Sequence, residues 1–286
     1  MREFKNKINS LIIKSVALTG IIALILIFGF VIRESIPALK EAGMEIFTSF
    51  DWYPTYDPPS FGILTMLINS ILLTIFSSLI VLPLGYIVAF FMYDYAKNFE
   101  KRMIKGAIDL LSGVPSVIIG MFLIIYVSPW MLEIGAWSPE NILLASIGLT
   151  ILSLPYTASL MEEAMSSIDK SLKEGALALG TTRFTAGFKV VSKAALPGIF
   201  NAIILTINRI IGETMVVLMA AGGANMLPLS ILDPIRPLTA AIASEMGEVE
   251  IGSIHYSALF VSGLVLLTIS FILTLTSKRL SRRWSK

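Results

Sequence analysis

The sequence contains no cysteine and a single histidine, His255, in 286 residues. The lack of cysteine excludes disulfide bonds, thiolate nucleophiles and iron–sulfur ligation, and one histidine cannot supply the His/Cys cluster of a structural zinc site. Charged residues are also scarce, at 15% of the chain against about 25% in soluble domains. The formal net charge of +2 is too small to indicate a nucleic-acid-binding protein.

The rest of the composition indicates an integral membrane protein. Apolar residues make up 55% of the chain and its mean hydropathy is +0.81, so a water-soluble globule would have to expose large apolar surfaces. A membrane-spanning helix needs about 20 mostly apolar residues, and the charge-poor stretches predict six such helices. We expect these spans at residues 11–33, 63–93, 107–130, 141–161, 198–222 and 254–277, in one all-α transmembrane domain that covers residues 1–286.

Basic residues lie mainly on one side of the predicted spans. Of the 22 lysines and arginines, 18 precede the first span or follow the second, fourth and sixth spans. The positive-inside rule therefore predicts that both termini and the connection 162–197 are cytoplasmic. The loops 34–61 and 223–253 would then lie outside. A signal peptide is the competing interpretation of residues 1–32, but the apolar run is longer than a typical signal-peptide core and no A-x-A-like site follows.

The two predicted outer loops are acidic and contain prolines, which favours ordered structure over a flexible linker. They are either a solvated surface or a surface on which another protein docks. We find no convincing internal repeat in the sequence, which weakens an interpretation as a secondary transporter built from duplicated halves.

The predicted cytoplasmic connection has the pattern of two short helices with apolar faces. Ser171 and Glu174 have the spacing of a capping box, which would start the first helix, and Gly180 is placed to end it. Thr181 or Thr182 can cap the second helix. Such a pair would either bind a partner protein or lie on the membrane surface as amphipathic helices.

Arg209 and Glu213 interrupt the apolar run of the fifth predicted span. If this span starts near Gly198, Arg209 lies about 16 Å along the helix axis at 1.5 Å per residue, near the bilayer midplane. A charge there costs roughly 2.5–3.5 kcal/mol on insertion scales, so it needs a partner or an aqueous cavity. The i, i+4 spacing would place Arg209 and Glu213 on one helix face, which Thr206 extends. This face is either an ion pair that joins helices or part of a polar path.

The cytoplasmic connection resembles the EAA loop of ABC importer permeases, in which Glu-Ala-Ala is followed by three residues and a glycine. Here the motif is Glu174-Gly175-Ala176, with Gly180 at the expected distance. Gly175 replaces the middle alanine, which should loosen the helix slightly. Ser192-Lys193 stands where the family usually has Leu-Pro.

Further stretches between residues 61 and 260 are similar to the phosphate-specific (Pst) permeases, and more to the PstC-type than to the PstA-type subunit. The matching stretches are Phe61–Leu64, Pro83–Gly85, Gly113–Val117, Ala176–Arg183, Arg209–Met215, Leu238–Ala240 and His255–Phe260. The resemblance implies a type I ABC importer permease-like subunit with a cytoplasmic coupling helix, in a prokaryotic inner membrane. It also implies transport of inorganic phosphate by alternating access.

The same resemblance implies a set of partners. They are a second, PstA-like permease, two ATP-binding subunits at the cytoplasmic loop, and an extracytoplasmic phosphate-binding protein at the outer loops. The residues expected to bind the ATPases are Glu174, Gly175, Ala176, Leu177, Leu179, Gly180, Thr182 and Arg183. The sequence has no Gly-Lys dipeptide and hence no Walker A loop. We therefore expect a transport subunit that is not an enzyme and binds no cofactor, with ATP used by a partner.

The expected substrate path consists of Arg209, Glu213, Thr206 and Ser116. Arg209 would give phosphate a bidentate donor, and Glu213 would partly neutralise it and could accept the proton-bearing oxygen of hydrogen phosphate. Ser116 lies on a ridge of small residues that is more typical of helix packing than of a ligand site. The alternatives are an ABC permease for another oxyanion, such as sulfate or molybdate, and a self-contained channel or ion-coupled transporter.

Overall fold

The computed structural model describes residues 2–284, with side chains described for residues 10–279. Its α-helices are α1 (Arg2–Glu41), α2 (Glu45–Thr48), α3 (Leu64–Phe90), α4 (Asn98–Ser112), α5 (Ser116–Phe122), α6 (Ser128–Glu133), α7 (Ile142–Ser166), α8 (Lys170–Ala178), α9 (Arg183–Thr185), α10 (Ser192–Ala194), α11 (Leu196–Ile211), α12 (Met215–Ala220), α13 (Leu238–Glu245) and α14 (Ile254–Trp284). The π-helical segments are η1 (Phe91–Tyr95), η2 (Leu123–Val127) and η3 (Ala186–Val191). Strands β1 (Trp52–Tyr53) and β2 (Ser60–Phe61) form a short antiparallel hairpin. The predicted all-α fold is confirmed.

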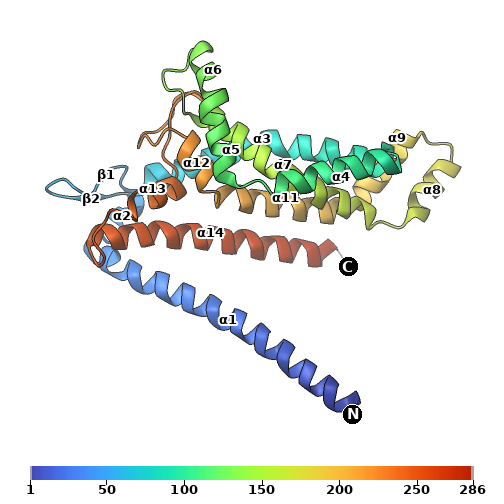
Figure 1. Cartoon of the computed structure of the whole chain (residues 1–286), viewed down its shortest axis with the longest axis horizontal. Coiled ribbons are helices and arrows are strands. Elements are labelled where there is room, and N and C mark those ends of the chain that lie inside the picture. Colours follow the sequence, from blue (N-terminus) through green and yellow to red (C-terminus); the bar gives the residue numbers. More distant parts are fainter. Residues whose placement is uncertain (1, 285–286) are drawn as a thin grey trace.

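The long helices run roughly along the long axis of the molecule (Figure 1). One end carries α8 and α9, and we call it the α8 end. The opposite end carries β1 and β2, and we call it the hairpin end. The N-terminal end of α1 and the C-terminal end of α14 both point toward the α8 end (Figure 1).

The core of the molecule forms where α7 packs between α3 and α11. Small side chains allow this close approach: a Cβ at Gly85 of α3 would lie only 2.6 Å from Cγ2 of Thr157 on α7, so only glycine fits there. The hydroxyls of Thr157 and Thr206 lie 3.0 Å apart and join α7 to α11. This pair of threonines thus forms an interhelical hydrogen bond, an interaction that is common between membrane helices.

Helix α1 is packed very differently from α7. It contacts mainly α14, through edge-to-face ring pairs of Phe28 with Phe271 and of Phe30 with Phe260. Its long apolar stretch is otherwise exposed in this chain. A helix that is apolar all round and unburied in its own chain must be covered by lipid or by another protein.

Five described helices are long and apolar enough to cross a membrane, and a bent pair makes a sixth candidate. The five are Ser10–Glu41, Leu64–Tyr95, Ser116–Glu133, Ile142–Ser166 and Ile254–Arg279. The sixth combines Arg183–Ala194 with Leu196–Ile211, which meet at a bend of 72°. Each of the six predicted spans overlaps one of these candidates, but the third and fifth predicted spans differ clearly from them in their boundaries.

The first difference is in the third predicted span, 107–130, which is not one helix. Helix α4 ends at Ser112, and α5 begins at Ser116 after a break. Pro115 causes this break, because its ring removes a backbone donor and disfavours the helical conformation of the residue before it. The apolar candidate span starts only at Ser116, so α4 is a separate amphipathic helix.

The second difference is in the fifth predicted span, 198–222. Helix α11 ends at Ile211, Gly212 caps it, and α12 begins only at Met215. Glycine disfavours the continuation of a helix. The carbonyl groups freed by the break are satisfied by hydroxyls: Thr239 Oγ1 donates to the carbonyl oxygen of Glu213 at 2.9 Å, and Thr214 Oγ1 to that of Gly212 at 3.4 Å.

Candidate functional site

The loop that resembles the EAA motif forms two helices separated by a tight turn. Helix α8 ends at Ala178, and Gly180 follows with a positive φ of 82°. The N–H of Gly180 donates to the carbonyl of Leu177 at 2.9 Å, and the N–H of Thr181 to that of Ala176 at 3.3 Å. This is a Schellman motif, which needs a left-handed residue and therefore favours glycine.

The N-terminal cap of α8 differs from the prediction. Asp169, and not Ser171, occupies the cap position, and its Oδ1 accepts the N–H of Ser171 at 2.9 Å. This hydrogen bond holds the pKa of Asp169 below its usual value. The predicted capping box of Ser171 and Glu174 is wrong because the helix starts one residue before Ser171. The second prediction is confirmed, since Thr182 Oγ1 accepts the N–H of Thr185 at 3.2 Å.

The turn presents apolar side chains to the outside of the molecule. Leu179, directly before Gly180, is 87% exposed, and Leu172, Leu177, Phe184 and Phe188 are exposed as well. Glu174 and Gly175 are also on the surface of α8, and a Cβ at Gly175 would meet no atom within 4 Å. Exposed apolar side chains gathered at one end of a molecule mark a protein or membrane contact.

Asp94 connects this loop to the end of α3. Its carboxylate is completely buried, and its Oδ1 accepts hydrogen bonds from Lys173 Nζ at 2.5 Å and from Arg183 Nε at 3.0 Å. Both cations also lie over aromatic rings, Lys173 over Tyr93 and Arg183 over Tyr95. Sequence reasoning did not identify Asp94, because an aspartate directly after an apolar run reads as a solvated flank.

A second buried carboxylate lies at the same end of the molecule. Glu162 of α7 pairs with Lys101 Nζ at 2.6 Å and with Lys105 Nζ at 3.2 Å, both on α4. Ser166 Oγ donates to the same carboxylate at 2.7 Å. These contacts attach the amphipathic helix α4 to α7, without involving α8.

Among the described residues, no hydrogen bond or ion pair joins any two of the four residues of the expected substrate path. Arg209 lies near the end of α11, exposed, with its guanidinium 5.3 Å from the ring centre of Tyr156. Glu213 lies beyond the helix end, and among the described residues no ion pair joins it to Arg209. The predicted shared helix face is therefore wrong, because the helix stops at Ile211.

The other two residues of the expected path have different surroundings. Thr206 is fully buried against Thr157, so its hydroxyl holds α11 to α7. Ser116 is half-buried at the first position of α5, directly after the Pro115 break. Thr206 lies one turn before Arg209 on α11, but its hydroxyl bonds Thr157 and not the guanidinium.

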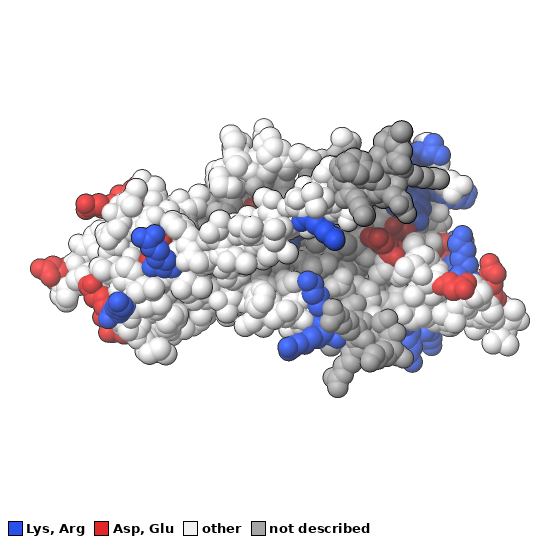
Figure 2. Space-filling model, turned by 90° about the horizontal axis from the view of Figure 1, so that it is seen from below, with Lys and Arg blue, Asp and Glu red and all other residues white. Residues whose placement is uncertain are grey.

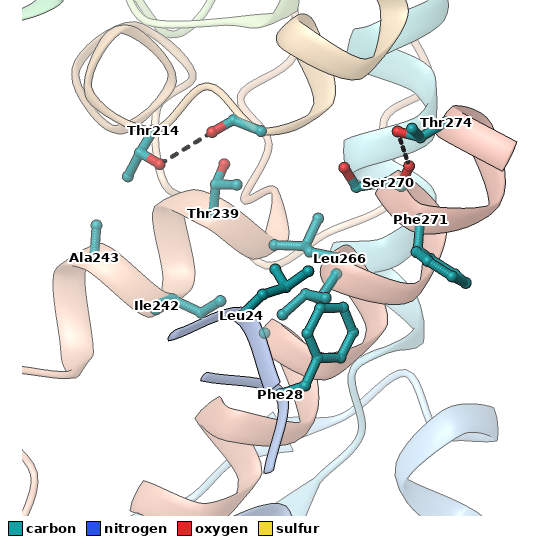
Figure 3. Close-up of a pocket in the computed structure, with 13 residues that line it drawn as sticks. Leu24, Phe28, Thr214, Thr239, Ile242, Ala243, Leu266, Ser270, Phe271 and Thr274 are labelled. Carbon is teal, nitrogen blue, oxygen red and sulfur yellow. Dashed lines mark hydrogen bonds between the residues drawn. The ribbon is translucent and has the colours of Figure 1, made fainter. Parts of the chain in front are cut away.

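A cavity of about 560 Å³ lies beside the break between α11 and α12. Figure 3 shows its lining: Thr214 and Thr239 on one side, Leu266, Ser270 and Phe271 of α14 on the other, and Leu24 and Phe28 of α1 across it. The surface of this cavity is mainly apolar with a few hydroxyls. In membrane proteins, irregular backbone at membrane depth is found where it is buried in protein or lines a cavity.

At the hairpin end, the carboxylate of Glu245 contacts three nitrogen-bearing side chains. Its carboxylate pairs with Arg236, accepts Trp52 Nε1 at 3.1 Å, and lies 2.6 Å from His255 Nε2. These groups border a second cavity of about 570 Å³. This network joins the hairpin to α13 and α14, so the hairpin end is an ordered surface.

Nearby, Asp233 organises the loop before α13. It accepts Trp137 Nε1 at 2.9 Å and the N–H groups of Leu229 and Ser230, both at 2.8 Å. These hydrogen bonds, the one from Trp137 first, hold the pKa of Asp233 below its usual value. On the face shown in Figure 2, charged side chains lie at the hairpin end and over the half of the molecule that includes the α8 end, with a white, uncharged zone between these two groups.

Comparison with known proteins identifies similar sequences over most of the chain. Residues 81–286 match the model of the family described as binding-protein-dependent transport system inner membrane component. A probable ABC transporter permease protein, YqgH of Bacillus subtilis, is 37% identical over 84% of this chain and 78% of its own length. The phosphate transport system permease protein PstC of Xylella fastidiosa is 29% identical over 87% of this chain and 82% of its own length.

The fold is also found among solved structures. A bacterial alginate ABC transporter, solved in complex with an alginate pentasaccharide-bound periplasmic protein, contains a chain that matches with a TM-score of 0.65 and 15% identity. The match covers 100% of this chain and 99% of that one. At this identity the likeness concerns the fold alone, and it agrees with the predicted permease architecture.

Proposed function

Because this chain belongs to the family of binding-protein-dependent transport system inner membrane components, and is thus a permease subunit of an ABC importer, we propose that it carries inorganic phosphate. Relatives named as PstC phosphate permeases support this cargo. The observation that carries the proposal is the guanidinium of Arg209, which has no ion-pair partner among the described residues and is exposed on an apolar helix.

An unpaired guanidinium at membrane depth needs an anion or water. Arg209 lies 13 residues after the start of α11, about 20 Å along the helix at 1.5 Å per residue. Its planar fork of donors suits a tetrahedral oxyanion, to which it can give two parallel hydrogen bonds. The exposed apolar surface of α1 and the exposed Arg209 are both explained if a second, PstA-like permease covers them and the anion passes between the two chains.

The break at Gly212–Thr214 supports a path at this position. Interrupted helices near the middle of a membrane are typical of transporter binding sites, because their free backbone groups can face substrate. Glu213 sits in this break, and its two chain neighbours, Gly212 and Thr214, line the cavity shown in Figure 3. Its carboxylate would disfavour a fully ionised anion and accept a hydrogen bond from hydrogen phosphate, which sulfate cannot donate at neutral pH.

The energy for transport would come from ATPases bound at the α8 end. The exposed leucines and phenylalanines of the coupling loop suit an apolar cleft on such a partner, and this chain has no Walker A sequence of its own. The chain would bind no cofactor. With the α8 end cytoplasmic, the ends of α1 and α14 point to the cytoplasm (Figure 1), as the distribution of basic residues predicts. A phosphate-binding protein would land on the hairpin end.

Uptake into vesicles tests the proposed cargo. We expect the chain, reconstituted with its partner permease, ATPases and binding protein, to import radiolabelled phosphate in the presence of ATP, with little competition from excess sulfate. Import of sulfate or molybdate at a similar rate would overturn the phosphate assignment but not the permease family. Import without ATP or ATPases would overturn the energy source instead.

The variant Glu213→Gln tests the basis of selectivity. Because glutamine keeps the shape but loses the negative charge, we expect this variant to lose its preference for phosphate over sulfate while it still assembles. The matched control is Glu163→Gln on the exposed surface of α7, which should leave selectivity unchanged. An unchanged preference in Glu213→Gln would reduce Glu213 to a structural role.

A further inference from the structure

We propose that Asp94 is the positioning residue that fixes the coupling loop to α3, so that α8 and the end of α3 move as one body. The role given to Asp94 rests on the proposed function, because it concerns the step between movement of the ATPases and transport. Its geometry rests only on contacts in this chain. Lys173 on α8 and Arg183 on α9 bind the same oxygen of Asp94 from the two sides of the Gly180 turn.

The surroundings of Asp94 make these two ion pairs rigid. The carboxylate is completely shielded from solvent, whereas Lys173 is only one-fifth exposed and Arg183 more than half exposed. Loss of a partner strongly destabilises a buried charge. A motion that separates α8 from Asp94 therefore costs more free energy than a motion in which α8 and Asp94 move together. The tyrosine rings under Lys173 and Arg183 hold the two cations in place.

The backbone is also shaped around this carboxylate. Asp94 lies in the π-helical segment η1, which directly continues α3, and segments of this kind are frequent at functional sites. On its other side Asp94 lies against Gly187 of η3, where a Cβ would come within 2.3 Å of Oδ2. Phe90, the last residue of α3, makes edge-to-face ring contacts with Phe184 and Phe188. Both helices of the loop thus meet α3 at one residue.

The other buried carboxylate at this end shows what Asp94 adds. Glu162 is equally well paired, but its cations Lys101 and Lys105 come from α4 and none comes from the coupling loop. Loss of Glu162 should therefore loosen α4 and leave α8 in place. Glu162→Gln is a matched control for Asp94→Asn, since both remove one buried charge from the same end of the molecule.

The experiment uses the absence of native cysteine in this chain. Cysteines at Lys170 on α8 and Phe99 on α4, both exposed, would carry spin labels, and double electron–electron resonance would measure their separation in the full chain and in the assembled transporter. We expect a narrow distance distribution in the parent and a broader, shifted one in Asp94→Asn. If Asp94→Asn does not fold, Lys173→Gln is the substitute, since it removes one of the same ion pairs by changing a partly exposed side chain. We expect it to broaden the distance distribution as well. For Glu162→Gln the second label is moved from α4 to Ser159 on α7, because loss of Glu162 should loosen α4. The distribution of distances between positions 170 and 159 should then be as narrow as in the parent with the same two labels.

The assembled transporter gives the functional readout. We expect Asp94→Asn to bind the ATPases and hydrolyse ATP, but to import less cargo per ATP by about tenfold, within the usual range of coupling between sites. Unchanged distances in both Asp94→Asn and Lys173→Gln would overturn the inference. An equally broad distribution of distances from the α8 label in Glu162→Gln would also overturn it. The distance measurement needs neither phosphate nor ATP, so a wrong cargo would leave it intact.

Discussion

Asp94 and Arg209 are the two charges that matter most in this account, and the chain treats them in opposite ways. Asp94 is buried and paired with two cations of the same chain. Arg209 is exposed, pairs with no carboxylate among the described residues, and lies over the ring of Tyr156. In our two proposals, the carboxylate that is paired within the chain transmits movement, whereas the guanidinium that is unpaired among the described residues binds another molecule. The predictions below test this contrast.

The largest expected effect is on stability. Asp94→Ala leaves Lys173 and Arg183 without their acceptor, and removal of one partner from a buried ion pair costs about 3–5 kcal/mol. Glu213→Ala is the control, because its side chain has no ion pair among the described residues, and we expect less than about 0.5 kcal/mol. Denaturant unfolding in detergent measures both. Equal losses would break the contrast.

The next effect is on transport without a loss of stability. Arg209→Ala removes charged hydrogen bonds to the anion, each worth about 1.5–3 kcal/mol, which corresponds to roughly a 10- to 150-fold slower uptake. The free energy of unfolding should not change, because no described side chain loses an ion-pair partner. Arg102→Ala, also exposed but on α4, is the control for a general loss of positive charge. A slower uptake in Arg102→Ala of the same size would contradict this role for Arg209.

Two glycines sharpen the comparison within the coupling loop. Gly187→Ala places a methyl group within 2.3 Å of Asp94 Oδ2, and overpacking of this kind costs about 1–3 kcal/mol. Gly175→Ala meets no atom within 4 Å in the interior of α8, so it should stabilise the helix by about 0.5–1 kcal/mol. Thermal unfolding shows directly whether each substitution raises or lowers the stability of the protein. A destabilised Gly175→Ala would contradict the exposed position of α8.

The smallest effect concerns pH at the hairpin end. Because the folded chain holds the pKa of Asp233 below its unfolded value, the stability it contributes is present above that unfolded pKa, near 4, and is lost as pH falls through the folded pKa. We expect the difference in unfolding midpoint between the parent and Asp233→Asn to shrink below about pH 4. A pH-independent difference for Asp233→Asn would contradict this.

The fold could be predicted well from the sequence, since each apolar stretch is long enough to decide its own structure. The errors occur where one residue overrides that average. Pro115 follows the end of α4 and Gly212 caps α11, although apolar residues lead directly up to both breaks, Leu110 and Leu111 before one and Ile210 and Ile211 before the other. Hydropathy cannot register such breaks, because it sums over many residues while a break depends on one.

The candidate site could be predicted only in part, for a related reason. The Gly180 turn and the Thr182 cap are local, and the sequence contains all that defines them. Asp94 depends on residues 79 and 89 positions away in the chain, and no spacing rule connects them. The expected contact of Arg209 with Glu213 failed because the i, i+4 rule holds only while the helix continues.

The most direct test of the account is the access of water to Arg209 in the assembled transporter. In this cysteine-free chain, Arg209→Cys and Ile272→Cys each give a single thiol, one at the proposed path and one on an exposed apolar face of α14. The account predicts that a charged, membrane-impermeant methanethiosulfonate modifies position 209 and not position 272. Modification of neither position, or of both at the same rate, would contradict an aqueous path past Arg209.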